Sequence, residues 1–138
     1  MASSMTEITV RYAETDQMGI VHHSNYPIYF EAGRTDFIKQ LGMPYSKIEA
    51  EGLLLPLIEM KCSFIMAAKY EDILLVKTFV KELTYTRVVF GYEVFKSGQA
   101  EPITVGQTHH VWTDRTLKPL NLKKKNPQIY ALLSSAVS

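Results

Sequence analysis

One long helical pattern in this chain is followed by four strand-like segments, and this order constrains the fold more than any other feature. The four segments comprise residues 54–66, 73–83, 87–96 and 103–113. Apolar side chains recur in them at every second residue, which is the period of a β-strand with one buried face. One face of the third segment, for example, carries Val88, Phe90, Tyr92 and Val94. Consecutive strands joined by short turns, such as the expected turn at 97–99, form an antiparallel sheet.

The long helix is predicted to begin just after Ser24 or Asn25. Either side chain can cap a helix, and Pro27 falls in the first turn, where its missing N–H has no cost. Residues then recur at helical spacing: Tyr26, Phe30, Gly33, Arg34, Phe37 and Leu41. Gly42, followed by a proline, is a stop signal. Gly33 in the helix interior predicts that the helix approaches a sheet closely.

The remaining elements are short. Residues 8–12 are predicted to form a first strand, residues 46–51 a helical turn, and residues from Asn126 and Pro127 onward a terminal helix. Residues 1–5 are expected to be a disordered extension outside the fold. The order of elements predicts an α+β fold in which an antiparallel sheet wraps one long helix. We expect a single domain over residues 1–138.

Charge and cysteine content exclude several classes of partner. The net charge is +1, which gives no electrostatic case for binding nucleic acid or a membrane surface. The basic run Lys123–Lys125 is typical of a solvated loop, with a seat for phosphate groups as the alternative. Cys62 is the only cysteine, which excludes an intrachain disulfide and favours a reducing compartment. No apolar run approaches the about 20 residues of a membrane helix, and no signal peptide is recognised, so we expect a soluble, cytoplasmic protein.

Candidate chemistry is concentrated in residues 12–26, which read Y-A-E-T-D-Q-M-G-I-V-H-H-S-N-Y. Asp16 lies in the predicted turn after the first strand, and His22 and His23 precede the helix. A helix start offers unpaired N–H groups and a positive dipole end, which stabilise a developing oxyanion. A nearby carboxylate can act there as a general base or as a nucleophile. Gly19 allows the loop to fold back, although on residue type alone a turn aspartate is more often a capping residue.

This stretch, followed by P-I-Y-F-E-A-G-R-T-D-F and later by A-A-K-Y-E-D at residues 67–72, resembles the signature of the hotdog-fold thioesterases. It is similar in particular to the 4-hydroxybenzoyl-CoA thioesterase and YbgC-type acyl-CoA thioesterases. The resemblance implies a curved antiparallel sheet around one helix. It also implies hydrolysis of acyl-CoA to a carboxylic acid and free CoA, with no metal and no redox cofactor. A thioester of acyl carrier protein is a second possible substrate.

The same resemblance assigns the site residues. Asp16 is implied as the general base or nucleophile, and the backbone N–H of His23 as the group that polarises the thioester carbonyl. The His23 side chain could orient water or protonate the leaving thiolate. Asn25 and Tyr26 are expected to fix the loop and the helix start within the substrate site. The candidate cations for the CoA phosphates are Lys61, Lys69, Arg87 and the Lys123–Lys125 run.

The resemblance further implies a homodimer, assembling to a tetramer, with sheets joined edge to edge and the site at the subunit interface. Glu31 is expected to be structural, Glu14 an ordinary loop residue, and His22 a solvated or packing residue. His109 and His110 occupy opposite faces of one predicted strand, so they cannot share a site. Two alternatives on the same fold stay open, namely an enoyl-thioester hydratase and a non-catalytic acyl-thioester binding module.

Overall fold

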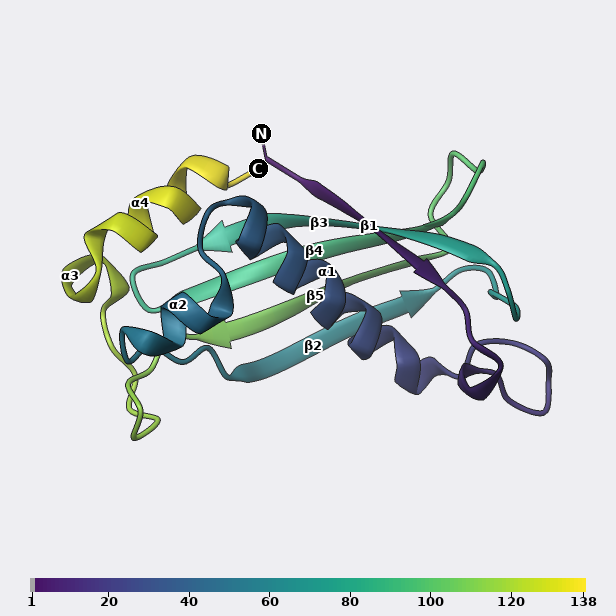
Figure 1. The fold of residues 1–138 in the computed structure, drawn as a ribbon, viewed down its shortest axis with the longest axis horizontal. Coiled ribbons are helices and arrows are strands. Elements are labelled where there is room, and N and C mark those ends of the chain that lie inside the picture. Colours follow the sequence, from purple (N-terminus) through teal and green to yellow (C-terminus); the bar gives the residue numbers. More distant parts are fainter. Residues whose placement is uncertain (1) are drawn as a thin grey trace.

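A five-stranded antiparallel sheet forms the frame of the protein, and helix α1 crosses one of its faces (Figure 1). The computed structural model describes residues 2–138, so Met1 lies outside the described residues. The strand order is β1-β3-β4-β5-β2. The strands are β1 (Ser4–Thr9), β2 (Leu57–Phe64), β3 (Ile73–Leu83), β4 (Arg87–Lys96) and β5 (Thr104–Val111). The helices are α1 (Tyr26–Gln40), α2 (Tyr45–Ala50), α3 (Leu122–Lys125) and α4 (Pro127–Ala136), with short 3-10 turns η1 (Tyr12–Glu14) and η2 (His23–Asn25).

This arrangement confirms the predicted α+β architecture. The bounds of β3 and β4 agree with the predicted segments, and the long helix begins and ends within one residue of its expected bounds. Asn126 caps α4 as predicted, because its side chain accepts a hydrogen bond from the Ile129 N–H at 3.1 Å. In β3 the period-two signal matches the burial pattern, in which buried residues alternate with half-buried ones, whereas β4 is buried on both faces from Val88 to Tyr92.

The first strand differs from its prediction. It begins at Ser4 and ends at Thr9, whereas residues 8–12 were expected to form it, and Tyr12 opens the turn η1. The expectation that residues 1–5 lie outside the fold is therefore wrong for Ser4 and Met5. Ser4 is buried opposite Thr78 of β3. A strand that buries small hydroxyl side chains carries little apolar signal, so periodicity does not reveal it.

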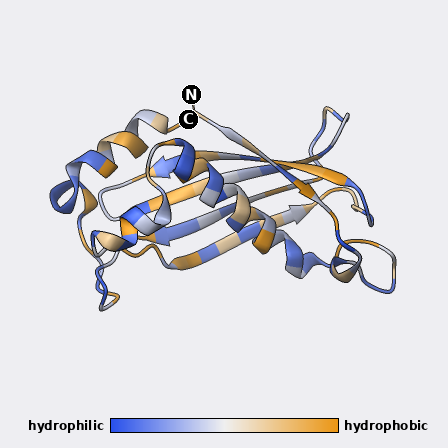
Figure 2. Cartoon of the chain, viewed as in Figure 1, coloured by the Kyte–Doolittle hydropathy of each residue, from blue (hydrophilic) through white to orange (hydrophobic). Residues whose placement is uncertain are grey.

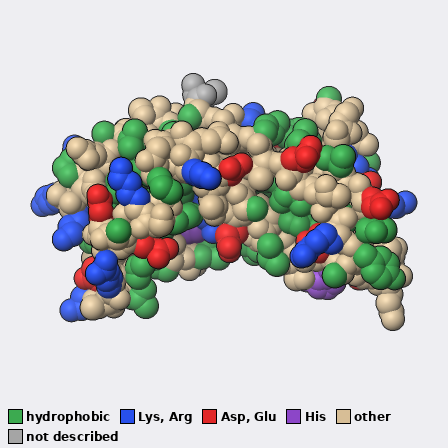
Figure 3. Space-filling view, in the orientation of Figure 1, with side chains coloured by type: hydrophobic (Ala, Val, Ile, Leu, Met, Phe, Trp, Pro, Cys, Tyr) green, Lys and Arg blue, Asp and Glu red, His purple; other side chains and the backbone are tan. Residues whose placement is uncertain are grey.

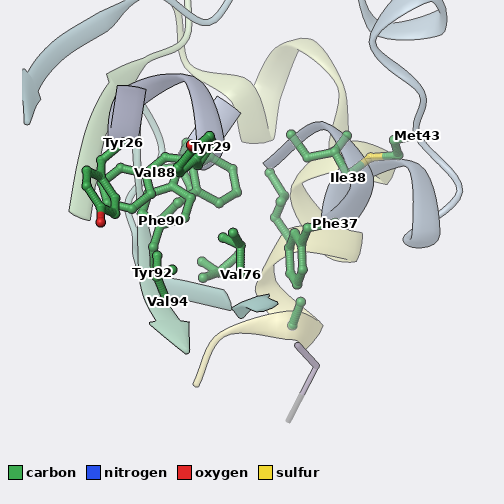
Figure 4. Close-up of a cluster of buried hydrophobic side chains, with 14 of the residues drawn as sticks. Tyr26, Tyr29, Phe37, Ile38, Met43, Val76, Val88, Phe90, Tyr92 and Val94 are labelled. Atoms are coloured by element: carbon green, nitrogen blue, oxygen red, sulfur yellow. The ribbon is translucent and has the colours of Figure 1, made fainter. Parts of the chain in front are cut away.

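The hydrophobic core lies between α1 and the sheet (Figure 4). The ring of Phe30 stacks on that of Tyr92, with ring centroids 4.3 Å apart and the planes nearly parallel at 8°. Gly33 confirms the predicted close approach: a Cβ at this position would lie 2.5 Å from Thr78 Oγ1 and 2.9 Å from Val76 Cγ1. Only a residue without a Cβ lets the helix sit at this depth.

Strand β2 is an edge strand and is more exposed than predicted. Hydrophobic and hydrophilic residues alternate along it (Figure 2), but the apolar face is not covered within this chain. Leu57, Ile58, Met60 and Phe64 are 52%, 47%, 39% and 53% exposed, and hydrophobic side chains reach the surface along this edge of the molecule (Figure 3). The half-buried strand expected from the sequence is thus an open apolar edge in the single chain. Such an edge is a ready surface for pairing with another strand.

The C-terminal elements cover the end of the sheet where β3 turns into β4, away from the loop between β1 and α1 (Figure 1). Lys123–Lys125, expected in a solvated loop, instead belong to α3, and Lys123 Nζ lies 5.1 Å from the centre of the Tyr85 ring. Helix α4 then returns to β3, where the Ser138 N–H donates to the Val80 carbonyl at 3.0 Å. None of the helices in residues 2–138 has both the length and the apolar character needed to cross a membrane.

Candidate active site

The loop between β1 and α1 folds back on itself at Gly19, as the sequence predicts. The Gly19 N–H donates to the Asp16 carbonyl, and the Asp16 N–H donates to the Ile20 carbonyl, both at 2.9 Å. Thr15 and Val21 form an isolated antiparallel bridge that closes the loop. Gly19 has φ of 78°, a conformation that is easy for glycine and strained for most other residues. The turn therefore holds Asp16 at a defined position.

The Asp16 carboxylate is half-buried and oriented by its own turn. Its Oδ1 accepts a hydrogen bond from the Met18 N–H at 2.9 Å, the usual pattern of an aspartate that closes a turn. This bond fixes the carboxylate plane and leaves Oδ2 available to a water molecule or a substrate atom. Asp16 thus fills the capping role that its residue type suggests and still offers one oxygen for chemistry.

A second segment supports this loop from the side. Ala67–Asp72 docks against it through the Val21 N–H, which donates to the Ala68 carbonyl at 2.8 Å. The Val10 N–H donates to the Asp72 carbonyl at 2.9 Å. The A-A-K-Y-E-D motif therefore acts as a buttress for the loop that carries Asp16.

The helix start is capped by a residue that the sequence analysis did not select. Ser24 and Asn25 were predicted as caps, but the side chain of Asn25 makes no capping bond to the helix. Instead His22 Nδ1 accepts from the Ser24 N–H at 3.2 Å and lies 2.8 Å from Ser24 Oγ. Asn25 does occupy the N-cap position of α1, but it makes no side-chain bond there, because a 3-10 turn with its own cap, His22, precedes the helix.

The backbone N–H of His23 is the donor left free at this helix start. The Glu14 carbonyl accepts the His22 N–H at 2.9 Å, and the His22 carbonyl accepts the Asn25 N–H at 3.0 Å. His22 Nδ1 takes the Ser24 N–H. Within the described residues, no carbonyl or side chain accepts a hydrogen bond from the His23 N–H, as expected for the first residue of a helical turn. It can therefore donate to a ligand oxygen.

Asp16 and His23 line one open cavity of about 260 Å³. Tyr26, at the start of α1, belongs to its wall, and its ring lies 5.3 Å from that of Phe64 at the end of β2. The other lining residues are Met18, Ile20, Val21, Ile65, Met66 and Ala67. The cavity thus combines one carboxylate, one histidine and one helix start with a largely apolar wall. Such a site can hold an apolar group beside a polarised carbonyl.

The other residues that the sequence singled out differ in how close they lie to the Asp16 cavity. Asn25 does not line the cavity; its Nδ2 donates to the Glu14 carbonyl at 2.9 Å and so holds the loop to the helix. Lys69 is next to Ala68, at the same end of the sheet as Asp16. Lys61 lines a separate cavity on the sheet with Lys81. Glu31 lines a third cavity, away from the Asp16 cavity.

Arg87 lies at the far end of the sheet from this cavity. It pairs with Val111 of β5, whereas Phe64, in the cavity wall, pairs with Thr104 of the same strand. Seven residues of β5 separate these two pairs, about 23 Å along a strand. Within one chain, Arg87 and Asp16 therefore do not share a site, and the same holds for Lys123–Lys125.

Glu14 is the functional candidate that sequence reasoning undervalued. It was expected to be an ordinary loop residue, yet it is 7% exposed and is the only carboxylate among the buried residues that the structure describes. Burial disfavours its charge, but hydrogen bonds from the Arg11 backbone, the Tyr29 hydroxyl and the Arg11 guanidinium outweigh burial and lower the pKa of Glu14. Its spacing of three residues from Arg11, typical of a capping box, was the available signal.

The chain is similar to proteins that hydrolyse thioesters. Residues 18–103 match the sequence model of the Thioesterase superfamily. The chain is 35% identical over 136 residues to YneP of Bacillus subtilis (strain 168), a match covering 99% of both chains. It is 28% identical over 91 residues to the acyl-CoA thioesterase YbgC of Haemophilus influenzae, which covers 65% of this chain and 67% of that protein. The DHNA-CoA thioesterase from Staphylococcus aureus superimposes with a TM-score of 0.92 at 34% identity, over 98% of this chain and 91% of that one.

Proposed function

Because the chain belongs to the thioesterase superfamily, with a hotdog fold and the acyl-CoA hydrolase activity of its relatives, we propose that Asp16 and His23 carry out the hydrolysis. The protein converts an acyl-CoA thioester and water into a carboxylic acid and free CoA. One observation carries the residue assignment: a turn-held carboxylate and an unpaired helix-start N–H line the same apolar cavity.

In the proposed mechanism the thioester carbonyl oxygen accepts a hydrogen bond from the His23 N–H. Asp16 Oδ2 takes a proton from a water molecule, whose oxygen attacks the carbonyl carbon. The helix start stabilises the oxyanion that forms, after which the carbon–sulfur bond breaks and the thiolate leaves with a proton. Direct attack by Asp16 on the carbonyl, followed by hydrolysis of the mixed anhydride, is the second route that the same geometry supports.

The His23 side chain has a distinct proposed role. Its ring lines the cavity and lies 6.4 Å from that of Phe64, so it reaches the space where the leaving sulfur would sit. A protonated imidazole there can donate its proton to the thiolate, and a neutral one can orient water. Asn25 and Tyr26 hold the loop and the cavity wall in place. Lys69 is the cation of this chain best placed to meet a CoA phosphate.

The cavity wall supports a preference for apolar acyl groups. Apart from Asp16, His23 and the Tyr26 hydroxyl, its lining side chains are aliphatic, methionine or phenylalanine. The hydroxyl of a hydroxylated aromatic acyl group would be buried against carbon unless it reached Asp16, His23 or the Tyr26 hydroxyl, and an unpaired buried hydroxyl is costly. Methionine side chains adapt their shape easily, so Met18 and Met66 support a tolerance for different chain lengths. Acyl-CoA and acyl-carrier-protein thioesters present the same acyl group to this wall.

We further propose that the protein forms a homodimer through β2. The exposed apolar side chains of β2 and its unpaired edge support this assembly. A two-fold axis would pair β2 with its copy in antiparallel register, so the start of one strand would lie beside the end of the other. The far end of one chain, with its Arg87, would then approach the Asp16 cavity of the other. This places the site at a subunit interface and gives Lys61 and Arg87 a route to the CoA phosphates.

A tetramer of two such dimers and a cytoplasmic location complete the proposal. Half-buried apolar side chains on the sheet face that α1 does not cover, including Leu75, Phe79 and Phe95, support packing of one dimer on another. The single cysteine, Cys62, supports a reducing compartment.

Release of free CoA from a panel of acyl-CoAs, followed with a thiol reagent, tests the proposed function. We expect turnover with straight-chain acyl groups of several lengths. A hydroxylated aromatic acyl-CoA should have a kcat/KM lower by about tenfold or more, because of its unpaired hydroxyl. Equal kcat/KM values across the panel would contradict the acyl preference alone. Binding of acyl-CoA with no thiol release from any member would contradict thioester hydrolysis.

A further inference from the structure

Glu14 binds together the parts of the active-site loop without lining the cavity. Its Oε1 accepts hydrogen bonds from the Arg11 N–H and the Tyr29 hydroxyl, each at 2.9 Å. Its Oε2 accepts from Arg11 Nε at 3.4 Å and Nη2 at 3.3 Å. The carboxylate is therefore engaged on both oxygens, which leaves it poorly suited to react with a substrate.

The backbone of Glu14 reaches the other catalytic group. Its carbonyl accepts the His22 N–H and Asn25 Nδ2, each at 2.9 Å. The His22 peptide leads directly into the His23 N–H, and Asp16 follows Glu14 by two residues. One residue therefore ties together the chain before the carboxylate, the chain before the oxyanion donor, and helix α1 through Tyr29.

We infer that Glu14 is a positioning residue for thioester hydrolysis: it sets the separation and orientation of the Asp16 carboxylate and the His23 N–H. This inference rests on the proposed function of those two groups. Catalysis of this kind depends strongly on geometry, since small displacements of reacting groups remove much of the rate. A buried anion with charge-assisted bonds to Arg11 and a bond to Tyr29 is well suited to hold such a geometry.

Tyr29 connects this anchor to the cavity wall. It is 2% exposed, and its ring packs edge to face on that of Tyr26 at 5.5 Å. Tyr26 lines the cavity. Removal of the Tyr29 hydroxyl should therefore loosen the Glu14 carboxylate while leaving the aromatic packing in place.

Two variants test this role. Glu14→Gln keeps one oxygen for the Arg11 N–H and Tyr29 but presents an NH2 group to the Arg11 guanidinium, which is also a donor. We expect Glu14→Gln to lower kcat by about tenfold or more while KM changes by less than about threefold, because ground-state binding is retained. Tyr29→Phe should lower kcat by about threefold to tenfold, since it removes one of the bonds to the carboxylate. Thermal unfolding of each variant establishes the folded fraction.

A matched control separates positioning from general destabilisation. Tyr92→Phe also removes a buried tyrosine hydroxyl from a hydrogen-bond network, but Tyr92 does not line the Asp16 cavity, and its hydroxyl bonds to Arg34 and Thr108 instead of the active-site loop. We expect Tyr92→Phe to lower the unfolding temperature while kcat stays within about twofold. Loss of the Tyr92 hydroxyl removes hydrogen bonds that stabilise the fold but do not position Asp16 or His23. A kcat loss in Tyr92→Phe equal to that in Glu14→Gln would overturn the positioning role.

The decisive comparison combines Glu14→Gln with Asp16→Asn. If Glu14 acts through Asp16, Glu14→Gln should have little further effect in the Asp16→Asn background. If Glu14→Gln lowered kcat by the same factor in both backgrounds, the inference would be overturned. Unchanged kcat in both Glu14→Gln and Tyr29→Phe would also overturn it. These outcomes leave the proposed function intact. If the native protein itself released no thiol, both the proposed function and the inference would fail.

Discussion

Glu14 and Asp16, two carboxylates two residues apart, have different roles in this loop, and their hydrogen bonds account for the difference. Glu14 has donors on both oxygens and is buried, so it serves the structure of the loop. Asp16 has one oxygen bound by the Met18 N–H and lines the cavity, so it keeps an oxygen for chemistry. The same reasoning separates the histidines: the His22 ring caps the helical turn, while His23 lines the cavity and its N–H has no acceptor among the described residues.

A backbone substitution at His23 tests the oxyanion donor. His23→Pro removes the N–H, and the fold should accept it because His23 is the first residue of the turn and His22 has φ −67° and ψ 138°, as the residue before a proline requires. His23→Ala keeps the N–H and is the control. We expect kcat of His23→Pro to be lower than that of His23→Ala by about 10²–10³-fold, the usual effect of losing one oxyanion donor. Equal kcat values for the two variants would show that this N–H does not stabilise the oxyanion.

Part of this site could be predicted from residue types. A helix-start signal, a glycine and an aspartate within a short loop place Asp16 near a helix N-terminus, because glycine permits the turn. The role of Glu14 could not be found in this way, since it depends on Tyr29 reaching it from α1. The His22 cap was also missed, because capping preferences favour Ser, Thr, Asp and Asn.

Among the secondary-structure elements, period-two patterns predicted the positions of strands well, but they predicted the solvent exposure of those strands poorly. The alternation identified β3, where it matches an alternation of buried and half-buried residues, and also β4, although residues 88–92 of β4 are buried on both faces. The same alternation in β2 does not reveal whether its apolar face is covered by this chain or by another. Strand β1 was misplaced because Ser4 and Thr6 are polar residues in a strand that pairs fully with β3.

The exposed edge of β2 leads to a prediction about assembly. Met60→Lys places a charge at the middle of this strand, and a two-fold axis would bring two such charges together. We expect the native protein to sediment as a dimer or larger, and Met60→Lys to sediment as a monomer with reduced kcat/KM. Leu132→Lys, at an equally exposed leucine of α4, the helix that packs against β3, is the control and should leave the assembly unchanged. A native protein that sediments as a monomer would contradict pairing through β2.

Across the whole molecule, a buried chain of hydrogen bonds joins α1 to the loop before β2. Arg34 Nη1 donates to the Tyr92 hydroxyl at 3.0 Å, and Tyr92 lies 2.6 Å from Thr108 Oγ1. His110 Nε2 lies 2.8 Å from the same Thr108 oxygen, and His110 Nδ1 lies 3.2 Å from the Leu55 carbonyl. Arginine only donates and a carbonyl only accepts, so Arg34 donates to Tyr92, and His110 Nδ1 donates to Leu55. With a neutral His110, Nε2 accepts from Thr108, and Thr108 in turn accepts from Tyr92.

This network makes stability depend on pH. Burial, and then the charge of Arg34, lower the pKa of His110 to about 4, below its usual 6.5. As pH falls below 6.5 the unfolded chain takes up a proton that the folded chain refuses until about 4, so stability is lost across this window. The loss approaches about 1.4 kcal/mol per pH unit from this group. Urea unfolding at pH 7, 5.5 and 4.5 should show a steeper fall for the native protein than for His110→Gln. Equal slopes would show that His110 does not set this dependence.

The turnover of Asp16→Asn tests the central claim most directly. Asparagine keeps the size of the side chain and an oxygen for the Met18 N–H, so the loop should keep its shape, and unfolding temperature and acyl-CoA affinity should change little. Loss of the general base or nucleophile should lower kcat for thiol release by about 10²–10⁴-fold. A kcat within a few-fold of the native value on every acyl-CoA would contradict the assignment of the chemistry to Asp16.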